Sequence, residues 1–211
     1  MIGRNDPNPE TNASLRVAIA NAKADSVPRD NIERILKKLS GADKDSVVYS
    51  QQVYEGFGPD GIPFIVTALT ENINRTFPDV RTAWSKSGGN MGSQGSVMFM
   101  FNHVGIIVIK NEDKSEDELF EAAIEAGAQD FTYDREGESE VITSFKELSS
   151  VQNALGSQGI TIIKSEPQYR AKDPKVVSDS EILDKLERFT DALEEVNDVD
   201  EVYSGFDVKE D

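Results

Sequence analysis

The stretch from Tyr54 to Phe101 constrains the fold most, because it alternates short apolar runs with glycines and neutral polar residues. Two of the runs, 53–57 and 62–69, flank Gly58-Pro59-Asp60-Gly61, a sequence typical of the turn in a β-hairpin. Glycines and neutral side chains favour a surface shaped for a partner over a catalytic cleft. We therefore expect this stretch to form an antiparallel sheet and to receive a phosphate-bearing partner.

One helix and one further strand are expected inside this stretch. The helix is predicted over 76–87, with Thr76 as its N-cap and Pro78 in the tolerated first turn. The strand is predicted over 96–101, and the only histidine, His103, then falls in a turn. Three side chains of the helix are expected to face the sheet: Phe77, Val80 and Trp84.

The second half of the chain has a regular order of elements. Its apolar periodicity predicts the order βαββαβ, that of the ferredoxin-like split unit, with both helices on one face of the sheet. Ser115 and Glu118 form a capping box at the start of the first helix. The predicted strands are 105–110, 130–134, 140–145 and 160–165, and the predicted helices are 115–126 and 146–158.

The last part of the chain is too small to form a domain alone. After an extended connection over 166–177, a helix is predicted over 179–196 and a strand over 201–206. We expect both to return to the sheet of residues 47–101, so that the βαββαβ unit is an insertion.

Two short helices, 11–24 and 30–40, are predicted before this sheet, so the expected fold class is α+β. The predicted parts are a partial helical amino-terminal domain over 1–46, a middle α/β domain over 47–103 plus 171–211, and an inserted ferredoxin-like domain over 104–170.

The formal net charge of −17 is unevenly distributed. Residues 1–46 carry eight Lys or Arg and seven Asp or Glu, residues 47–111 carry four of each, and residues 112–211 carry ten against 28. The second half repels a polyanion, so nucleic acid is expected to bind through residues 1–100. The acidic half is either a solvated surface or a partner for basic ribosomal or polymerase proteins.

Missing residue types exclude whole classes of site. The chain has no cysteine, which excludes disulfides and thiolate metal sites. No apolar run is long enough for a transmembrane helix, so we expect a cytoplasmic protein without membrane contact. His103 has no recognisable catalytic partner and the acids are spaced as helix faces, so no catalytic residue, metal site or cofactor is predicted.

Two glycine patterns look like nucleotide-binding loops but have the wrong context. Gly56-Phe57-Gly58 precedes a turn and a strand, and the glycines over 88–95 follow a helix. A phosphate loop needs a strand before its glycines and a helix after them, together with a lysine and a hydroxyl residue. Nucleotide hydrolysis is therefore not expected.

A better anion site lies at the start of the helix predicted over 76–87. Asn72 and Asn74 offer neutral donors there, and Arg75 adds a charge beside free helical N–H groups. Arg81 and Lys86 lie farther along the same helix and extend the candidate contact surface.

These basic groups also have a structural interpretation. The two asparagines can merely shape a turn, and Arg75 can pair with an acid such as Glu71 or Asp79. Further cations lie off the apolar stripes of the two early helices, where solvated helix faces look the same. These further candidate contacts for nucleic acid are Arg16, Lys23, Arg34, Lys37 and Lys38.

Several segments together resemble the YebC family. They are NPETNASLRVAIANAKADSVPRDNIERILKKLSG, YEGFGPDGIPFIV, ENINRT, VRTAWSKSGGNMGSQGSV and, near the end, YSGF. The family includes bacterial proteins described as probable transcriptional regulators and the mitochondrial translational activator of cytochrome c oxidase. The resemblance covers nearly the whole chain and implies a helical amino-terminal domain and two α/β domains, the last inserted in the middle one.

The resemblance also implies a strongly basic segment before the stretch that corresponds to Asn8-Pro9. This sequence opens directly at that stretch. We therefore expect weaker binding to nucleic acid, since each lost phosphate contact lowers the affinity.

The residues and the resemblance together favour a non-enzymatic regulator of gene expression that binds nucleic acid. In the first version the protein is a DNA-binding transcriptional regulator, and in the alternative it is a translational activator that contacts ribosomal RNA on the ribosome. No helix presents Arg, Asn or Gln at successive turns, which suits recognition of RNA by shape. Two other classes stay open: an enzyme acting on a small phosphorylated ligand at 72–75, and an adaptor that binds proteins.

Overall fold

The computed structural model describes residues 49–209 except 113, 135 and 136, and it also describes a few earlier positions. Those positions are Leu15, Ile19, Ala22, Arg29, Asn31, Ile32, Glu33 and Leu36. All of them are helical. Seven lie within the predicted helices 11–24 and 30–40, and Arg29 lies one residue before the second of these; the other residues of both predicted ranges lie outside the described residues.

The described chain combines α-helices with mainly antiparallel sheets, so its fold class is α+β, as predicted. It divides into two compact units. His103–Gln168 belong to one, to which we refer as the βαββαβ unit. Val47–Asn102 and Tyr169–Asp211 form the other, to which we refer as the two-segment unit. The three predicted domains, with their boundaries, stay a prediction.

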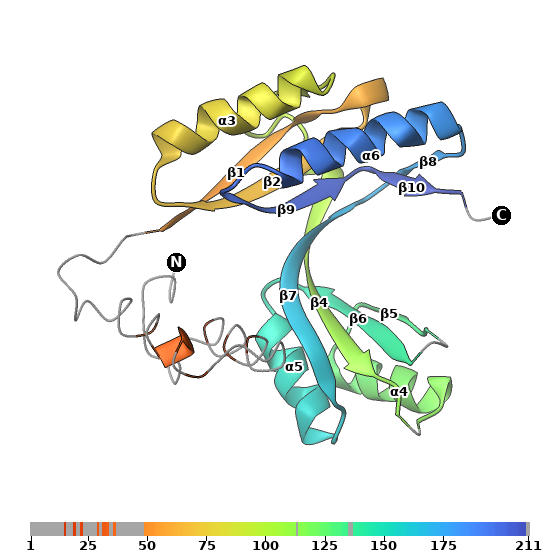
Figure 1. Cartoon of the computed structure of the whole chain (residues 1–211). Helices are drawn as coiled ribbons and strands as arrows, with labels where there is room; N and C mark the ends of the chain where they lie inside the picture. The colour runs from red at the N-terminus through yellow and green to blue at the C-terminus, as the bar shows by residue number, and fades with distance from the viewer. Residues whose placement is uncertain are drawn as a thin grey trace. The chain divides into compact units, whose positions relative to one another are not determined.

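A four-stranded sheet with the order β3-β1-β2-β9 forms the centre of the two-segment unit. β1 (Ser50–Phe57) and β2 (Pro63–Thr70) form the predicted hairpin around the short turn Pro59–Gly61. β3 (Asn90–Met91) extends the sheet beside β1 for two residues, and β9 (Val199–Ser204) pairs antiparallel with β2. The strand predicted near the end of the chain therefore returns to this sheet (Figure 1).

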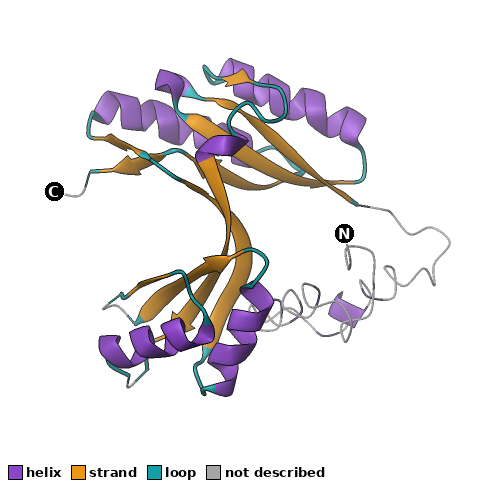
Figure 2. Cartoon of the chain, turned by 180° about the vertical axis from the view of Figure 1, so that it is seen from behind, coloured by secondary structure: helices purple, strands orange, loops and turns teal. Residues whose placement is uncertain are grey.

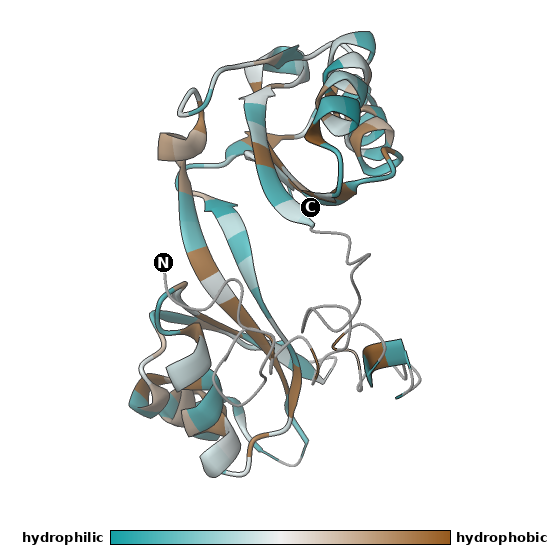
Figure 3. Ribbon diagram, turned by 90° about the vertical axis from the view of Figure 1, so that its left-hand side faces the viewer, coloured by the Kyte–Doolittle hydropathy of each residue, from teal (hydrophilic) through white to brown (hydrophobic). Residues whose placement is uncertain are grey.

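Two amphipathic helices, α3 (Ile73–Lys86) and α6 (Ser180–Glu194), cover one face of this sheet (Figure 1). Trp84 of α3 and Phe189 of α6 pack edge to face with ring centroids 5.7 Å apart, and Phe189 lies 4.8 Å from the ring of Phe64. Burying each of these side chains stabilises the fold by about 1.5–3 kcal/mol, so the aromatic cluster fixes α3 on the sheet. Both helices mix hydrophilic and hydrophobic residues along their length (Figure 3).

α3 begins earlier than the sequence predicts. Asn72 is its N-cap, and not Thr76, because the Asn72 side chain accepts a hydrogen bond from the Arg75 N–H group. Pro78 therefore lies inside the helix and not in its first turn. The inward orientation predicted for Phe77 is wrong, since Phe77 is 41 % exposed and the hydrogen-bonded hydroxyl of Thr76 is buried instead. The other two residues predicted to face the sheet are buried: Val80 and Trp84.

The strand predicted over 96–101 is wrong. The chain there forms a 3₁₀ turn over Met98–Met100, and β4 (Phe101–Lys110) then runs without a break. His103 lies inside β4 and stacks on Phe145 with ring centroids 4.1 Å apart, so the predicted turn at this histidine is wrong as well. The cause is the buried carboxylate of Glu55 in β1, which accepts hydrogen bonds from the backbone N–H groups of Val97 and Met98 in this segment.

The βαββαβ unit has the element order that the sequence predicts. After β4 come α4 (Glu116–Ala126), β5 (Asp130–Thr132), β6 (Glu138–Ser144), α5 (Leu148–Ser157) and β7 (Ile162–Ala171). The sheet order is β5-β6-β4-β7, and Figure 2 shows both helices beside this sheet. Side chains of β4, β6 and both helices share one hydrophobic core. The predicted capping box of Ser115 and Glu118 is present at the start of α4.

The extended connection predicted over 166–177 is partly strand. β7 continues into it, and β8 (Lys175–Val177) then pairs in parallel with β10 (Phe206–Val208). The strand predicted over 201–206 is divided at Gly205, because β9 pairs with β2 while β10 pairs with β8. The β9–β2 ladder joins the two segments of the two-segment unit, and the β8–β10 ladder lies within the second segment.

Candidate functional site

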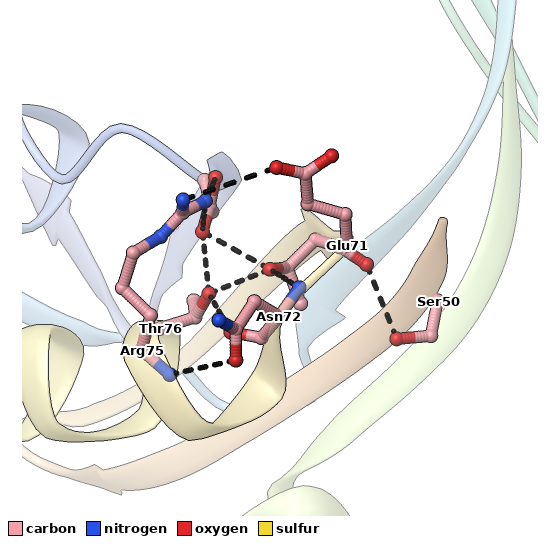
Figure 4. Close-up of polar contacts among 7 residues, drawn as sticks. Ser50, Glu71, Asn72, Arg75 and Thr76 are labelled. Carbon is pink, nitrogen blue, oxygen red and sulfur yellow. Dashed lines mark hydrogen bonds and ion pairs between the residues drawn. The ribbon is translucent and has the colours of Figure 1, made fainter. Parts of the chain in front are cut away.

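The predicted anion site lies at the start of α3, where a carboxylate of the chain itself binds. Asp198, in the turn between α6 and β9, accepts hydrogen bonds from the hydroxyl groups of Thr70 and Thr76. The Arg75 Nη2 atom lies 3.0 and 2.9 Å from the two Asp198 carboxylate oxygens (Figure 4). Asn72 completes the arrangement as the N-cap of the helix. The polar groups at the start of α3 therefore form hydrogen bonds and an ion pair with one another.

These contacts shift the pKa values of both charged partners. The hydrogen bond from Thr76, followed by that from Arg75, lowers the pKa of Asp198 below its ordinary value. The hydrogen bond to Asp198 and its charge raise the pKa of Arg75. Glu71 lies 4.0 Å from the guanidinium, and Asp79 acts on it through charge alone. Of the two interpretations of Arg75, the ion pair with an acid is the one observed, and Asp198 is its main partner.

A second polar region lies beside the middle of α3, where the structure forms a groove of about 750 Å³. Phe77, Arg81 and Ser85 line one side of it, because residues four apart share one side of a helix. β1 contributes residues 51–55, and the glycine-rich segment at β3 contributes residues 90–94. All described residues that line the groove belong to the two-segment unit.

Neutral hydrogen-bonding groups dominate the groove. Among the described residues that line it, the amide side chains are those of Gln51, Gln52, Asn90 and Gln94, and Arg81 is the only cation. None of these five side chains has a hydrogen-bond or ion-pair partner in the described part of the chain. They are therefore available to a ligand, unlike the polar groups at the start of α3.

Glu55, the one acid among the described residues that line the groove, is already bound by backbone groups. Its residue is 2 % exposed, and its carboxylate accepts N–H groups from Gly95, Val97 and Met98 at 2.6, 2.9 and 2.8 Å. Burial acts to raise the pKa of Glu55, but the three hydrogen bonds outweigh burial and lower this pKa below its ordinary value. The ionised carboxylate therefore holds the segment after β3 in place as a wall of the groove.

Glycine is required where this segment approaches β1. A Cβ atom at Gly56 would collide with the carbonyl oxygen of Asn90, and one at Gly92 would collide with the side chain of Ser96. Gly95 has a φ of +87°, a left-handed conformation that glycine adopts without strain. The glycines of this stretch thus allow close packing of two backbone segments.

The predicted contact residues fall into separate groups. Asn72 and Arg75 belong to the network around Asp198, and Asn74 is exposed in the first turn of α3. Arg81 lines the groove, and Lys86 is exposed at the end of α3 without an ion pair in the described chain. The remaining candidates lie outside the described residues: Arg16, Lys23, Arg34, Lys37 and Lys38.

Sequence reasoning missed the amides of the groove and the carboxylate behind them. Gln51 and Gln52 precede an apolar run and look like ordinary strand-end residues. Glu55 does carry a usable signal, because an acid between Tyr54 and Gly56 in a buried strand needs internal donors. Its donors lie about 40 residues away along the chain, which no local pattern reveals.

The described residues show neither a membrane-spanning helix nor a cluster of metal ligands. No helix in this part of the chain is long and apolar enough to cross a membrane. Likewise, no group of three or more His, Cys, Asp or Glu residues among those described is placed to hold a metal ion.

Known proteins match the chain over almost its whole length. Residues 49–206 match the second and third domain of TACO1/YebC, and residues 2–42 match the TACO1/YebC N-terminal domain. A probable transcriptional regulatory protein of Persephonella marina is 42 % identical over 202 residues, which cover 96 % of this chain and 80 % of that protein. One of Clostridium botulinum is 43 % identical over 197 residues, which cover 93 % of this chain and 79 % of that protein.

The fold is also found in a solved structure. A conserved hypothetical protein from Aquifex aeolicus superposes with a TM-score of 0.88 at 36 % identity, and the match covers 98 % of this chain and 84 % of that one. The sequence motifs, the relatives and the shared fold agree, and the chain belongs to the TACO1/YebC family.

Proposed function

We propose that this protein is a non-enzymatic regulator of gene expression that binds nucleic acid along the groove side of α3. The observation that carries the proposal is the position of Arg81 in an amide-lined groove, with Lys86 exposed five residues further along α3. Neither cation has an acidic partner in the described chain. The relatives named probable transcriptional regulatory protein support a regulatory role.

Each part of this surface suits one part of a nucleic acid. Arg81 and Lys86 attract phosphates, while the amides of Gln52 and Gln94 can both donate to and accept from base edges. The exposed ring of Phe77 offers a face on which an unpaired base can stack. Two cations give a modest electrostatic attraction, so we expect an affinity that falls gently with salt concentration.

Promoter DNA is the first target that we propose, on the names of the relatives. Ribosomal RNA is the second candidate, and one observation favours it. The groove side of α3 presents Phe77, Arg81 and Ser85, and not a row of Arg, Asn or Gln that would read bases in the major groove. RNA recognition by shape and backbone needs no such row.

The start of α3 gives no support to an enzyme that acts on a small phosphorylated ligand. The Asp198 carboxylate already takes the Arg75 guanidinium and the Thr76 hydroxyl there, and its charge repels a phosphate. We further propose that the βαββαβ unit is an inserted ferredoxin-like domain, whose acidic surface is available to basic partner proteins.

Fluorescence anisotropy with the full chain tests the nucleic-acid proposal. The probes are labelled duplex DNA and single-stranded RNA of equal length, about 20 nucleotides, titrated at several salt concentrations. We expect the double variant Arg81→Ala with Lys86→Ala to bind about tenfold more weakly, with an unchanged Tm. Lys185→Ala with Arg188→Ala is the matched control, because it removes the same charge from exposed positions of α6.

The outcomes separate the candidates. An equal loss of binding in both double variants would show that the loss comes from the change in net charge. That result would contradict a binding site on α3. Tighter binding of DNA supports the first target. Tighter binding of RNA, together with co-sedimentation of the full chain with ribosomal subunits in a gradient, supports the second.

A further inference from the structure

β1 has an open backbone edge beside the groove. On its inner side β1 pairs with β2 along its whole length, whereas on its outer side β3 pairs with only its last two residues. The Glu55 carbonyl accepts the Gly92 N–H group at 2.8 Å, so the backbone of Glu55 faces the outer side. Backbone groups of alternate residues face the same side of an antiparallel strand. Those of Val53 and Gln51 therefore face outward as well.

No described residue pairs with these outward groups. In the described part of the chain, the N–H and C=O groups of Gln51 and Val53 make no hydrogen bond on the outer side. Both residues line the groove, so the space beside this edge is accessible. An accessible edge with unpaired N–H and C=O groups is a template for another strand.

We propose that an extended segment of a partner protein docks along this edge as an additional strand, in line with β3 and antiparallel to β1. Gln51 and Val53 offer donors and acceptors in alternation, which is the pattern that a peptide backbone matches. A nucleic-acid backbone offers phosphate oxygens, which accept hydrogen bonds and are repelled by the outward carbonyl groups. The edge itself therefore fits a peptide better than a nucleic acid.

The side chains of the groove define the chemistry of this segment. The amides of Gln52 and Gln94 pair with polar or amide side chains of the incoming strand. Arg81 favours an acidic side chain, because the carboxylate of Glu55 is already bound by backbone N–H groups. The exposed ring of Phe77 adds a contact for one apolar residue. The partner segment is therefore extended and neutral or acidic.

The inference goes beyond the proposed binding of nucleic acid. The two proposed ligands share side chains of the groove, namely Arg81, Phe77, Gln52 and Gln94. The strand pairing, however, rests on backbone groups of β1 alone. A test of the backbone edge at Gln51 therefore leaves Arg81 and Lys86 unchanged.

Selection from a displayed library of random peptides on the full chain tests the proposal, with Gln51→Pro and Gln51→Ala as matched variants. Proline removes the outward N–H group, and on an edge strand it leaves the inner pairing intact. Alanine removes the same side chain but keeps the N–H group. We expect the selected peptides to bind Gln51→Ala nearly as well as the unmodified chain and Gln51→Pro at least about tenfold more weakly.

A second measurement does not depend on how the proline variant folds. The strongest selected peptide is synthesised unmodified and with N-methyl groups at alternate residues, which block backbone pairing but keep every side chain. The unmodified peptide is expected to slow hydrogen exchange at the N–H groups of Gln51 and Val53, and the methylated one is expected to lose binding.

Three results would overturn the proposal. The first is a selection that enriches no peptide on the unmodified chain, and the second is equal binding of the methylated peptide. The third is protection of the Gln51 and Val53 N–H groups by the oligonucleotides of the anisotropy assay but by no selected peptide. That last result would assign the edge to nucleic acid.

Discussion

The start of α3 and the groove beside the middle of α3 are about two helical turns apart. Both regions are rich in polar groups, but the groups at the start of α3 have partners within the chain, whereas the amides and the cation of the groove have none among the described residues. At the start, Asp198 pairs with Arg75 and accepts the hydroxyl of Thr76, so donors and acceptors of the chain satisfy one another. In the groove, Arg81 and Gln94 have no partner among the described residues. The first region holds the fold together, and the second is available to a ligand.

This difference teaches that a cation beside a helix N-terminus does not by itself mark a ligand site. Arg75 has the sequence position expected of an anion-binding residue, and its anion is a carboxylate 123 residues further along the same chain. Arg81, in the interior of the helix, is the residue that lines an accessible groove. The two regions differ in whether their polar groups already have partners within the chain, and not in residue type.

Removal of the carboxylate behind the groove is expected to have the largest effect. Glu55→Ala leaves three backbone N–H groups without their acceptor, one of them on the buried Val97, so the free energy of unfolding should fall by about 2–3 kcal/mol. Glu55→Gln keeps one acceptor oxygen and should lose less. Urea denaturation followed by the fluorescence of Trp84, the single tryptophan, measures both. Equal stability of the alanine variant and the unmodified chain would show that the loop is held by other contacts.

Smaller, pH-dependent effects are expected from the two hydrogen-bonded carboxylates, Asp198 at the start of α3 and Glu55 behind the groove. The folded-state pKa values of Asp198 and Glu55 lie below their ordinary values of 3.8 and 4.5, so each carboxylate binds protons less readily in the folded state. The stabilisation is therefore present above those ordinary values and is lost as the pH falls through the lower folded-state values. Asp198→Asn should lower Tm by several degrees at pH 7, and the difference from the unmodified chain should shrink at acid pH. A difference that grows on acidification would contradict the assignment of Asp198 as ionised.

The smallest effect on stability is expected from the groove amides. Gln52→Ala with Gln94→Ala removes side chains that have no partner in the described chain, so the free energy of unfolding should change by less than about 0.5 kcal/mol. Binding of the labelled oligonucleotide in the anisotropy assay, and binding of the selected peptide, should both weaken. A large loss of stability in this variant would show that the groove amides also hold the fold together, which would contradict the difference between the two regions.

Local patterns predicted those parts of the fold that local interactions decide. The order βαββαβ follows from apolar periodicity, and the capping box of Ser115 and Glu118 follows from a pair three residues apart. The hairpin around Gly58 to Gly61 follows from its turn residues. The return of the last strand to the sheet of residues 47–101 was also predicted, from the need to bury that strand, but its pairing with β2 was not.

Distant partners decide the parts that the sequence failed to predict. The buried face of α3 includes Thr76 because the hydroxyl of Thr76 binds Asp198, 122 residues further along the chain. The predicted strand over 96–101 is a 3₁₀ turn because Glu55 binds its N–H groups. Of the residues predicted to contact nucleic acid, Arg81 lines the groove, and its role in binding stays a prediction. The groove itself was not predicted, because it arises from segments of three elements that meet only in the folded chain.

The most direct test compares Arg75→Ala with Arg81→Ala, two identical charge deletions on one helix, by Tm and by binding to the same labelled oligonucleotide. Arg75→Ala should lower Tm and leave binding nearly unchanged, because it leaves Asp198 without its guanidinium. Arg81→Ala should leave Tm unchanged and weaken binding. The opposite pattern, with binding lost in Arg75→Ala at constant Tm and Arg81→Ala without effect, would contradict the account.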